Sequence, residues 1–245
     1  MTIESKSNKL ISYAKKLQTK KYSQEYCECF LECEKIILER LNNINTILLV
    51  ASYKNEYSEI LKYFSGNIYY ISGEIAKYLT EASNPSKIFA FMYIKKNKIS
   101  NSNFLVLDNL QDPNNLGAII RSARAFNFNK IYAINCVYPY LYKTIRSSMG
   151  YIFDIDFESV SYEKFKEIKN SEDLFLYCAD MNGENINSTP KLSQTIGVCI
   201  GNEGNGVSDF ISNICDKTIS IKMNNSVESL NASVSAGIIM HKLSE

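Results

Sequence analysis

Histidine is almost absent from this chain: its 245 residues contain only one, His241, and its seven cysteines form no C-x-x-C pair. Zinc sites in proteins are usually built from Cys and His residues at paired spacing. We therefore expect no metal site, and we interpret the clustered Cys27, Cys29 and Cys33 as small packing residues. His241 is interpreted as a packing or surface residue. An odd number of scattered cysteines also argues against a secreted disulfide framework, so reduced thiols are expected.

Long apolar runs are absent as well. A transmembrane helix needs roughly 20 consecutive apolar residues, and no stretch of the sequence approaches that length. The opening residues, MTIESKSNKL, are charged and are not followed by the apolar core of a signal peptide. The sequence therefore predicts a cytoplasmic protein with no membrane segment. Apolar residues make up 45% of the chain, which is enough for the core of one large domain or two modest ones.

The net charge of +1 hides an asymmetry along the chain. Residues 1–101 carry 15 Lys and Arg against 10 Asp and Glu, whereas the remaining residues carry 12 against 16. A basic front half favours a polyanionic partner such as nucleic acid. Lysine-rich surfaces are also often simply solvated, so both interpretations stay open on charge alone.

The front of the chain mixes helical and strand-like patterns. Apolar residues at helical spacing predict a first helix at Lys9–Lys21. Short β-like runs follow at Thr46–Ser52 and Asn67–Ser72, and further helical patterns occur at Glu34–Leu41, Glu56–Tyr63 and Gly73–Glu81. This predicts a small α/β unit. The polar stretch Ile94–Asn103 is typical of a linker or domain boundary.

Beyond this stretch, apolar runs of strand length alternate regularly with helical patterns. The runs read NFLVLDNL, KIYAINC, LFLYCAD, TIGVCIGNE and TISIKM, and the helical patterns cover Leu116–Phe126, Ser161–Lys169, Val207–Asn213 and Ser229–Leu243. Strands that are apolar on both faces and alternate with helices predict a parallel sheet covered by helices on both faces. Ligands of such sheets bind beyond the carboxyl ends of the strands, so the chemistry is expected in the loops that follow these runs.

The first such loop reads DNLQDPNNLG and precedes an amphipathic helix. Asp112 is expected to cap the helix, Pro113 to fix its first turn, and Gly117 to let it pack closely. Arg121 and Arg124 lie away from the apolar side, three residues apart, where both can grip one anionic group. A solvated helix face is the alternative for this loop taken alone.

Two further loops share this character. IGNEGNG has three glycines that permit unusual backbone conformations, and Glu203 lies among them, although the pattern is neither a P-loop nor a dinucleotide fingerprint. IKMNNSVESLNASVSAG leads into a helix whose start holds Ser229 and Asn231, followed by small residues that favour close helix contacts within the chain or between subunits. A flexible turn and ordinary helix capping are the respective alternatives.

At these residues the chain resembles the SpoU/TrmH-like RNA ribose 2′-O-methyltransferases of the SPOUT class. DNLQDPNNLGAIIRSARAF, IGNEGNGVSD and MNNSVESLNASVSAGI match the three motifs of that family in order and spacing. The front, through NKLISYAKKLQTKKY and FLECEKIILERL, is similar to the family's small substrate-binding domain. The resemblance implies an RNA-binding domain at 1–98, and a methyltransferase domain at 99–245 with a C-terminal trefoil knot, an exception to the rule that chains do not thread loops.

The resemblance also implies a cofactor, a partner and residue roles. The knot would hold S-adenosylmethionine, and the family usually acts as a homodimer on RNA. By motif position, the catalytic residues are Asn115, Arg121, Glu203, Ser229 and Asn231, the cofactor-binding residues are Gly201, Asn202, Ile221, Met223 and Leu230, and the RNA-binding residues are Arg124 and Arg146. A free guanidinium stays protonated in proteins, so we expect Arg121 to bind phosphate and stabilise the developing alkoxide, with Glu203 orienting it.

Two positions depart from the family pattern. Lys222 stands where the family usually has proline, and Cys33 where it commonly has glycine. The expected function is methylation of a ribose 2′-hydroxyl of RNA, with ribosomal RNA favoured by the basic front domain. Transfer RNA, or a ribosomal nucleotide whose methylation confers antibiotic resistance, is an alternative target. A catalytically inactive, ribosome-associated RNA-binding protein is the rival interpretation.

Overall fold

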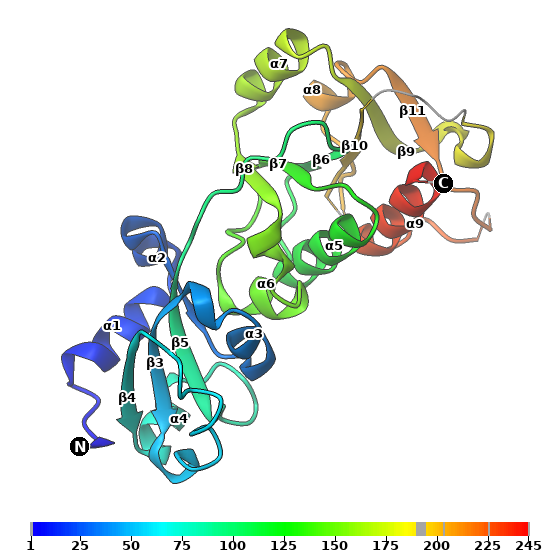
Figure 1. The fold of residues 1–245 in the computed structure, drawn as a ribbon. Helices are drawn as coiled ribbons and strands as arrows, with labels where there is room; N and C mark the ends of the chain where they lie inside the picture. The colour runs from blue at the N-terminus through cyan, green and yellow to red at the C-terminus, as the bar shows by residue number, and fades with distance from the viewer. Residues whose placement is uncertain (1, 190–194, 203, 225, 245) are drawn as a thin grey trace. The chain divides into compact units, whose positions relative to one another are not determined.

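The computed structural model describes residues 2–189, 195–202, 204–224 and 226–244, and the chain divides into two compact units (Figure 1). The first unit comprises residues 1–95 and 140–146, and the second comprises residues 96–139 and 147–245. The contiguous division expected at 98/99 therefore does not describe residues 140–146. Within this segment, burial and the nearby Glu32 carboxylate raise the pKa of Tyr142, which places the segment against the first unit.

The first unit contains a five-stranded mixed sheet of order β1-β4-β3-β5-β2. Its strands are β1 (Thr2–Ile3), β2 (Glu28–Leu31), β3 (Ile44–Val50), β4 (Asn67–Ile71) and β5 (Ile88–Tyr93). β4 pairs in parallel with β1 and β3, whereas β5 pairs antiparallel with β2 and β3. Four helices accompany the sheet: α1 (Lys9–Leu17), α2 (Lys20–Tyr26), α3 (Glu34–Glu39) and α4 (Gly73–Leu79).

The apolar faces of α1 and α4 supply the core of this unit. Ile11, Ala14 and Leu17 recur at helical spacing and pack with Ile75 and Leu79 against the sheet. Two helix predictions differ from the structure here. The predicted helix Lys9–Lys21 is interrupted after Leu17, and the predicted helix Glu56–Tyr63 is a series of hydrogen-bonded turns that follows the short 3₁₀ helix η2 (Ala51–Tyr53). A second 3₁₀ helix, η1 (Leu41–Asn43), precedes β3.

The second unit contains a six-stranded sheet of order β11-β9-β10-β6-β7-β8, and every pairing in it is parallel. Its strands are β6 (Phe104–Asp108), β7 (Lys130–Ile134), β8 (Asp156–Ser159), β9 (Phe175–Asn185), β10 (Ile196–Ile200) and β11 (Lys217–Ser220). The two central strands, β6 and β10, are buried along their whole length. The predicted parallel sheet is therefore confirmed, and β8 is an additional edge strand.

Helices cover both faces of this sheet, as predicted (Figure 1). They are α5 (Pro113–Ala125), α7 (Tyr162–Ser171), α8 (Asp209–Ser212) and α9 (Ala232–Ser244), with 3₁₀ turns η3 (Tyr151–Asp154) and η4 (Ile186–Ser188). A further helix, α6 (Tyr142–Ser147), belongs to the first unit except for its last residue. Phe165 of α7 and Ile211 of α8 pack on one face with Phe104 and Val106, while α5 and α9 lie together on the other. None of the helices in the described ranges has the length and apolar character needed to cross a bilayer.

Two element boundaries near the third loop differ from the prediction. β11 ends at Ser220 rather than Met223, and α9 begins at Ala232 rather than Ser229. The described residues between them form an irregular loop, so Ser229 lies outside the helix. The small residues of α9 serve a contact within the chain, because Ala232 and Ala236 are buried and Gly237 lies close to Ser122 of α5.

Candidate active site

The site is built at the amino-terminal end of α5, directly beyond the carboxyl end of β6. Asp112 caps the helix by accepting a hydrogen bond from the backbone N–H of Asn114, and Pro113 occupies the first helical position, as predicted. Asn115 is only 8% exposed. An asparagine buried this deeply must have partners for its amide. The local sequence thus presents one polar side chain on an otherwise apolar helix face.

Asn231 provides such a partner. Its Nδ2 donates to Oδ1 of Asn115 at 3.0 Å, although the two residues are 116 positions apart. Its own Oδ1 accepts from the backbone N–H and the hydroxyl of Ser233 at 2.9 and 2.6 Å, which caps α9. The structure therefore brings the first and third predicted loops together, and one amide serves both the capping and the inter-loop contact.

The glycine-rich loop is organised by Asn202. Its backbone exchanges two hydrogen bonds with Gly206, and its Oδ1 accepts from the N–H of Gly204 at 2.8 Å. Its Nδ2 donates to the backbone carbonyl of Asn109 at 2.9 Å, which ties this loop to the first one. A Cβ added to Gly201 would lie 2.1 Å from the carbonyl carbon of Gly206, so only glycine fits at the entry.

Asp108 and Tyr162 are polar residues of this region that sequence reasoning missed. Asp108 ends β6, is fully buried, and accepts from the Tyr162 hydroxyl at 2.7 Å. It also accepts from Nδ2 of Asn109 and from the backbone N–H of Ser208, both at 2.8 Å. The sequence did carry a signal for this cluster, because Asp108 ends an apolar strand. A carboxylate buried there needs hydrogen-bond donors from other segments.

The predicted arginines are exposed but lie in different settings. Arg121 is exposed on α5, and Arg124, one turn further on, donates to Oδ1 of Asn129 at 2.8 Å. Arg146 belongs to the first unit, where its Nη1 donates to the Tyr142 hydroxyl at 2.8 Å. Arg121 and Arg124 thus share one side of α5, whereas Arg146 is in the other unit.

The remaining predicted site residues border the same loops. Ile221, Met223 and Leu230 are half-buried, and Ser229 is exposed in the loop before α9. Lys222, which replaces the usual proline, is exposed. Glu203, the predicted partner of Arg121, lies outside the described residues.

Close packing fixes α5 beside the turn that follows α6. A Cβ added to Gly117 would lie 1.8 Å from the Ser147 hydroxyl and 2.8 Å from the backbone nitrogen of Ser148. The prediction that Gly117 lets the helix pack closely is therefore confirmed. At the other end of α5, the ring of Phe126 lies 5.3 Å from that of His241, so the histidine packs against α5.

The cysteines are free thiols with differing burial. Cys29 is buried as predicted, and burial raises its pKa, which keeps the thiol neutral. Cys27 is exposed instead, because it ends α2 in the left-handed conformation with φ of 50°. Within the described ranges, no group of three or more His, Cys, Asp or Glu residues is arranged to hold a metal ion.

Known proteins share the sequence segments that form these loops. The family model described as the SpoU rRNA Methylase family matches residues 102–241, which include all three loops. The chain belongs to the SpoU rRNA methylase family. One relative that matches nearly the whole chain is the 23S rRNA (guanosine(2553)-2′-O)-methyltransferase RlmP of Bacillus subtilis, which is 27% identical over 98% of each chain. Another is the mitochondrial rRNA methyltransferase 1 of Dictyostelium discoideum, 34% identical over 60% of this chain and 30% of that protein.

Solved structures of this SpoU-like fold superpose on the chain. The AdoMet-bound rRNA methyltransferase from Sinorhizobium meliloti gives a TM-score of 0.87 at 20% identity, covering 99% of this chain and 97% of that one. The SpoU methyltransferase AviRb from Streptomyces viridochromogenes, in complex with AdoMet, gives 0.86 at 21% identity and covers 97% of each chain. These likenesses establish the fold. The trefoil knot stays a prediction from the resemblance.

Proposed function

We propose that this protein transfers a methyl group from S-adenosylmethionine to a ribose 2′-hydroxyl of RNA, with ribosomal RNA as the substrate, in the cytoplasm. The observation that carries the proposal is the hydrogen bond between Asn115 and Asn231, which joins two motif segments of a SpoU family member. A protein that only bound RNA would have no need for this contact between two motif segments. The relative RlmP, named as a 2′-O-methyltransferase of 23S rRNA, supports the same activity.

The residues present fit the cofactor. Backbone groups at Gly201, Ile221 and Leu230 are offered as its hydrogen-bonding partners, and the half-buried side chains of Met223 and Leu230 as its apolar lining. Asn202 acts indirectly, because its side chain and its backbone hydrogen bonds with Gly206 hold the loop in shape. When bound, S-adenosylmethionine supplies an electrophilic methyl group on a positively charged sulfur. Transfer requires this methyl and the ribose oxygen to be held in line.

The arginines of α5 bind and orient the RNA in this proposal. Arg121 and Arg124 lie three residues apart on the exposed side of the helix, a spacing at which two guanidinium groups reach one phosphate. Arg121 also stabilises the alkoxide that develops as the ribose proton leaves. Its partner in this role is Glu203, and Ser229 and Asn231 orient the reacting groups from the loop before α9. The amide of Asn231 is held in place by its contacts with Asn115 and Ser233.

A surface of paired lysines and tyrosines supports RNA binding by the first unit. Two ammonium groups lie over the ring of Tyr78, with Nζ of Lys6 and of Lys15 at 5.0 and 5.1 Å from its centre. Tyr22 is flanked in the same way by Lys16 and Lys21, each at 5.3 Å. Alternating ammonium groups and aromatic faces suit a chain of phosphates and bases. We call these six residues the lysine–tyrosine surface, and Arg146 is a further proposed RNA contact of this unit.

The proposed active form is a homodimer. Val234 and Ile238 are 49% and 40% exposed and lie four residues apart on α9, so they form a short apolar stripe on one side of the helix. A second copy of the chain is the partner that the family resemblance favours for this stripe. Sedimentation velocity tests this part of the proposal: a single species with the mass of one chain, at the concentrations used for activity, would contradict it.

Incubation with tritiated S-adenosylmethionine and total RNA from cells that lack this protein tests the proposed activity. We expect label in ribosomal RNA with the wild type and none with Arg121→Ala, while calorimetry shows similar cofactor binding for both. Arg40→Ala, in the first unit, is the matched control and should retain transfer. Label in transfer RNA alone would show that transfer RNA, not ribosomal RNA, is the substrate. No cofactor binding and no label in any RNA would favour the inactive RNA-binding protein.

A further inference from the structure

We infer that Asp108 is a positioning residue of the cofactor site: through Asn109, Tyr162 and Ser208 it fixes both ends of the glycine-rich loop that the cofactor is proposed to contact. This inference rests on the proposed function, because it concerns the same site. Asp108 touches neither cofactor nor RNA in this scheme. It acts through the loop, and the loss of its carboxylate is expected to weaken cofactor binding more than it slows the chemical step.

The Asp108 carboxylate is fully buried and surrounded by donors on both oxygens. Its Oδ1 accepts from the Tyr162 hydroxyl at 2.7 Å and from Nδ2 of Asn109 at 2.8 Å. Its Oδ2 accepts from the backbone N–H of Ser208 at 2.8 Å. The same Asn109 amide also donates to the Tyr162 oxygen at 2.7 Å, so these side chains form a closed ring of hydrogen bonds. A buried carboxylate with satisfied oxygens is rigid as well as stable.

This ring holds the glycine-rich loop at two points. At the far end of the loop, the N–H of Ser208 is bonded directly to Asp108. At its near end, Nδ2 of Asn202 donates to the carbonyl of Asn109, the residue next to Asp108. Between these points Asn202 and Gly206 exchange backbone hydrogen bonds and close the turn. Moving the Asp108–Asn109 segment would therefore displace both ends of the loop together.

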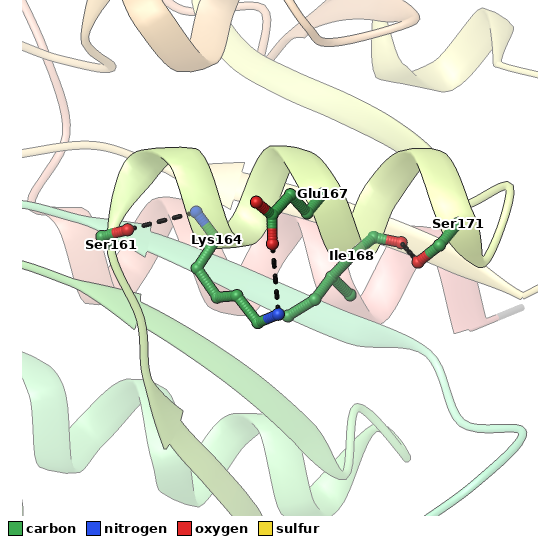
Figure 2. Close-up of polar contacts among 5 residues, drawn as sticks. All are labelled: Ser161, Lys164, Glu167, Ile168 and Ser171. Atoms are coloured by element: carbon green, nitrogen blue, oxygen red, sulfur yellow. Dashed lines mark hydrogen bonds and ion pairs between the residues drawn. The ribbon is translucent and has the colours of Figure 1, made fainter.

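The two neighbours of Asp108 are themselves fixed. Asn109 adopts a left-handed conformation with φ of 58°, and its N–H donates to the Ile134 carbonyl at 2.9 Å, so its carbonyl is aimed at Asn202 by the backbone. Tyr162 is the first residue of α7. Figure 2 shows how that helix is secured: Ser161 caps it by accepting from the Lys164 N–H at 3.1 Å, and a Lys164–Glu167 ion pair follows.

An Asp108→Asn substitution changes one acceptor into a donor without changing the shape of the side chain. The new NH₂ group faces either the Ser208 N–H or the Tyr162 and Asn109 donors. In either orientation at least one of the hydrogen bonds that Asp108 accepts is lost. Tyr162→Phe removes a single hydroxyl and keeps the aromatic side chain, whose ring centre lies 5.1 Å from that of Phe210. The matched control is Tyr132→Phe, which removes a hydroxyl from a buried tyrosine on β7 outside this network.

Calorimetry with S-adenosylmethionine on the full chain, with thermal melts to confirm folding, tests the inference. We expect Asp108→Asn to weaken cofactor binding by about tenfold, the change expected from the loss of roughly one buried hydrogen bond to a charged group. Tyr162→Phe should weaken it less and Tyr132→Phe not at all. Turnover at saturating cofactor should fall by a smaller factor than the affinity does.

Hydrogen–deuterium exchange of peptides spanning residues 201–208, without cofactor, gives an independent measurement. Faster exchange there in Asp108→Asn and Tyr162→Phe, with Tyr132→Phe unchanged, supports the fixing of the glycine-rich loop by Asp108. Absence of cofactor binding by the wild type would overturn the proposed function, but it would leave this result for the loop standing. If Asp108→Asn does not fold, the calorimetry and the exchange measurement on Tyr162→Phe test the inference instead. Wild-type affinity and wild-type exchange in the folded variants would overturn the positioning role.

Discussion

At the scale of single residues, the site depends on asparagine amides that use their donor and acceptor ends for different purposes. Asn231 caps α9 with its oxygen and contacts Asn115 with its nitrogen. Asn202 shapes the glycine-rich loop with its oxygen and binds the first loop with its nitrogen. Aspartate would reproduce only the acceptor half of each arrangement. The two functions can therefore be separated by substitution.

Asn231→Asp and Asn231→Ala make this separation. Asp keeps the cap, so its free energy of unfolding should stay close to that of the wild type, whereas Ala should lose about 1 kcal/mol. Both lose the donor to Asn115, and methyl transfer should fall in both. Chemical denaturation and the tritium assay measure the two effects. Full activity in Asn231→Asp would show that the contact with Asn115 is not needed.

Glu32 in the first unit gives a pH dependence. It is 4% exposed, and burial raises its pKa above the ordinary value of 4.5. Because the folded state then binds the proton more tightly than the unfolded state, this group favours folding at low pH. Its contribution is lost as the pH rises from about 4.5 through the folded pKa. Glu32→Gln should therefore raise the thermal midpoint at pH 8 and change it less at pH 4, as thermal melts at both pH values would show.

At the scale of elements, the regular second half was largely predictable. The runs that form β6, β7, β9 and β10 are apolar on both faces, and this pattern is typical of a buried strand in a parallel sheet. The first half was less so: β2 and β5 were missed, and the turns at 54–63 were taken for a helix. Short runs such as ECFL have too few residues to show a period, and tertiary contacts decide their structure.

Helix packing gives a prediction with an internal control. Gly117→Ala places a methyl group 1.8 Å from the Ser147 hydroxyl, and should lower the free energy of unfolding by about 1–3 kcal/mol. Gly73→Ala, at the first residue of α4, meets nothing within 4 Å and should be neutral or slightly stabilising. Denaturant titration of both variants measures the difference. Equal stability of the two would contradict the close contact of α5.

The candidate site could be predicted only in part. The motif residues predicted that three loops form one site, and the Asn115–Asn231 contact confirms that the first and third converge. The ring around Asp108 could not be derived, because it joins residues of β6, α7 and the glycine-rich loop, and a single sequence contains no record of such distant pairings. The positions of the predicted site residues relative to bound cofactor and RNA stay predictions.

At the scale of the whole molecule, the proposal gives the first unit a role in RNA binding alone, and gives the second unit the chemistry together with the orientation of the RNA. The lysine–tyrosine surface lies on α1, α2 and α4 and the residues before them, all in the first unit. The arginines of α5 and the cofactor loops lie in the second. Changes in the surface are therefore expected to alter RNA affinity and its salt dependence while leaving cofactor affinity unchanged.

Lys16→Gln with Lys21→Gln tests this expectation. If both ammonium groups contact phosphates, the double variant should weaken binding of ribosomal RNA and reduce the slope of log affinity against log salt by about 1.4 to 1.8. Lys35→Gln with Lys87→Gln removes the same charge from lysines that are paired with Glu39 and Glu56, and is the control. Filter binding at several salt concentrations measures the slope. Identical slopes for the two double variants would exclude the surface as the RNA contact.

The pairing of β6 with β10 also determines when during synthesis the site can form. β6 lies between β7 and β10, and the Asn103 side chain just before it bonds the backbone of Ile196 at the start of β10, 93 positions later. Asn115 acquires its partner later still, because Asn231 follows it by 116 positions. Before Asn231 has been made, the nascent chain can complete the first unit, which ends at Arg146, but not the proposed site. We therefore expect a chain that stops before Asn231 to lose methyl transfer while it keeps the RNA affinity of the first unit.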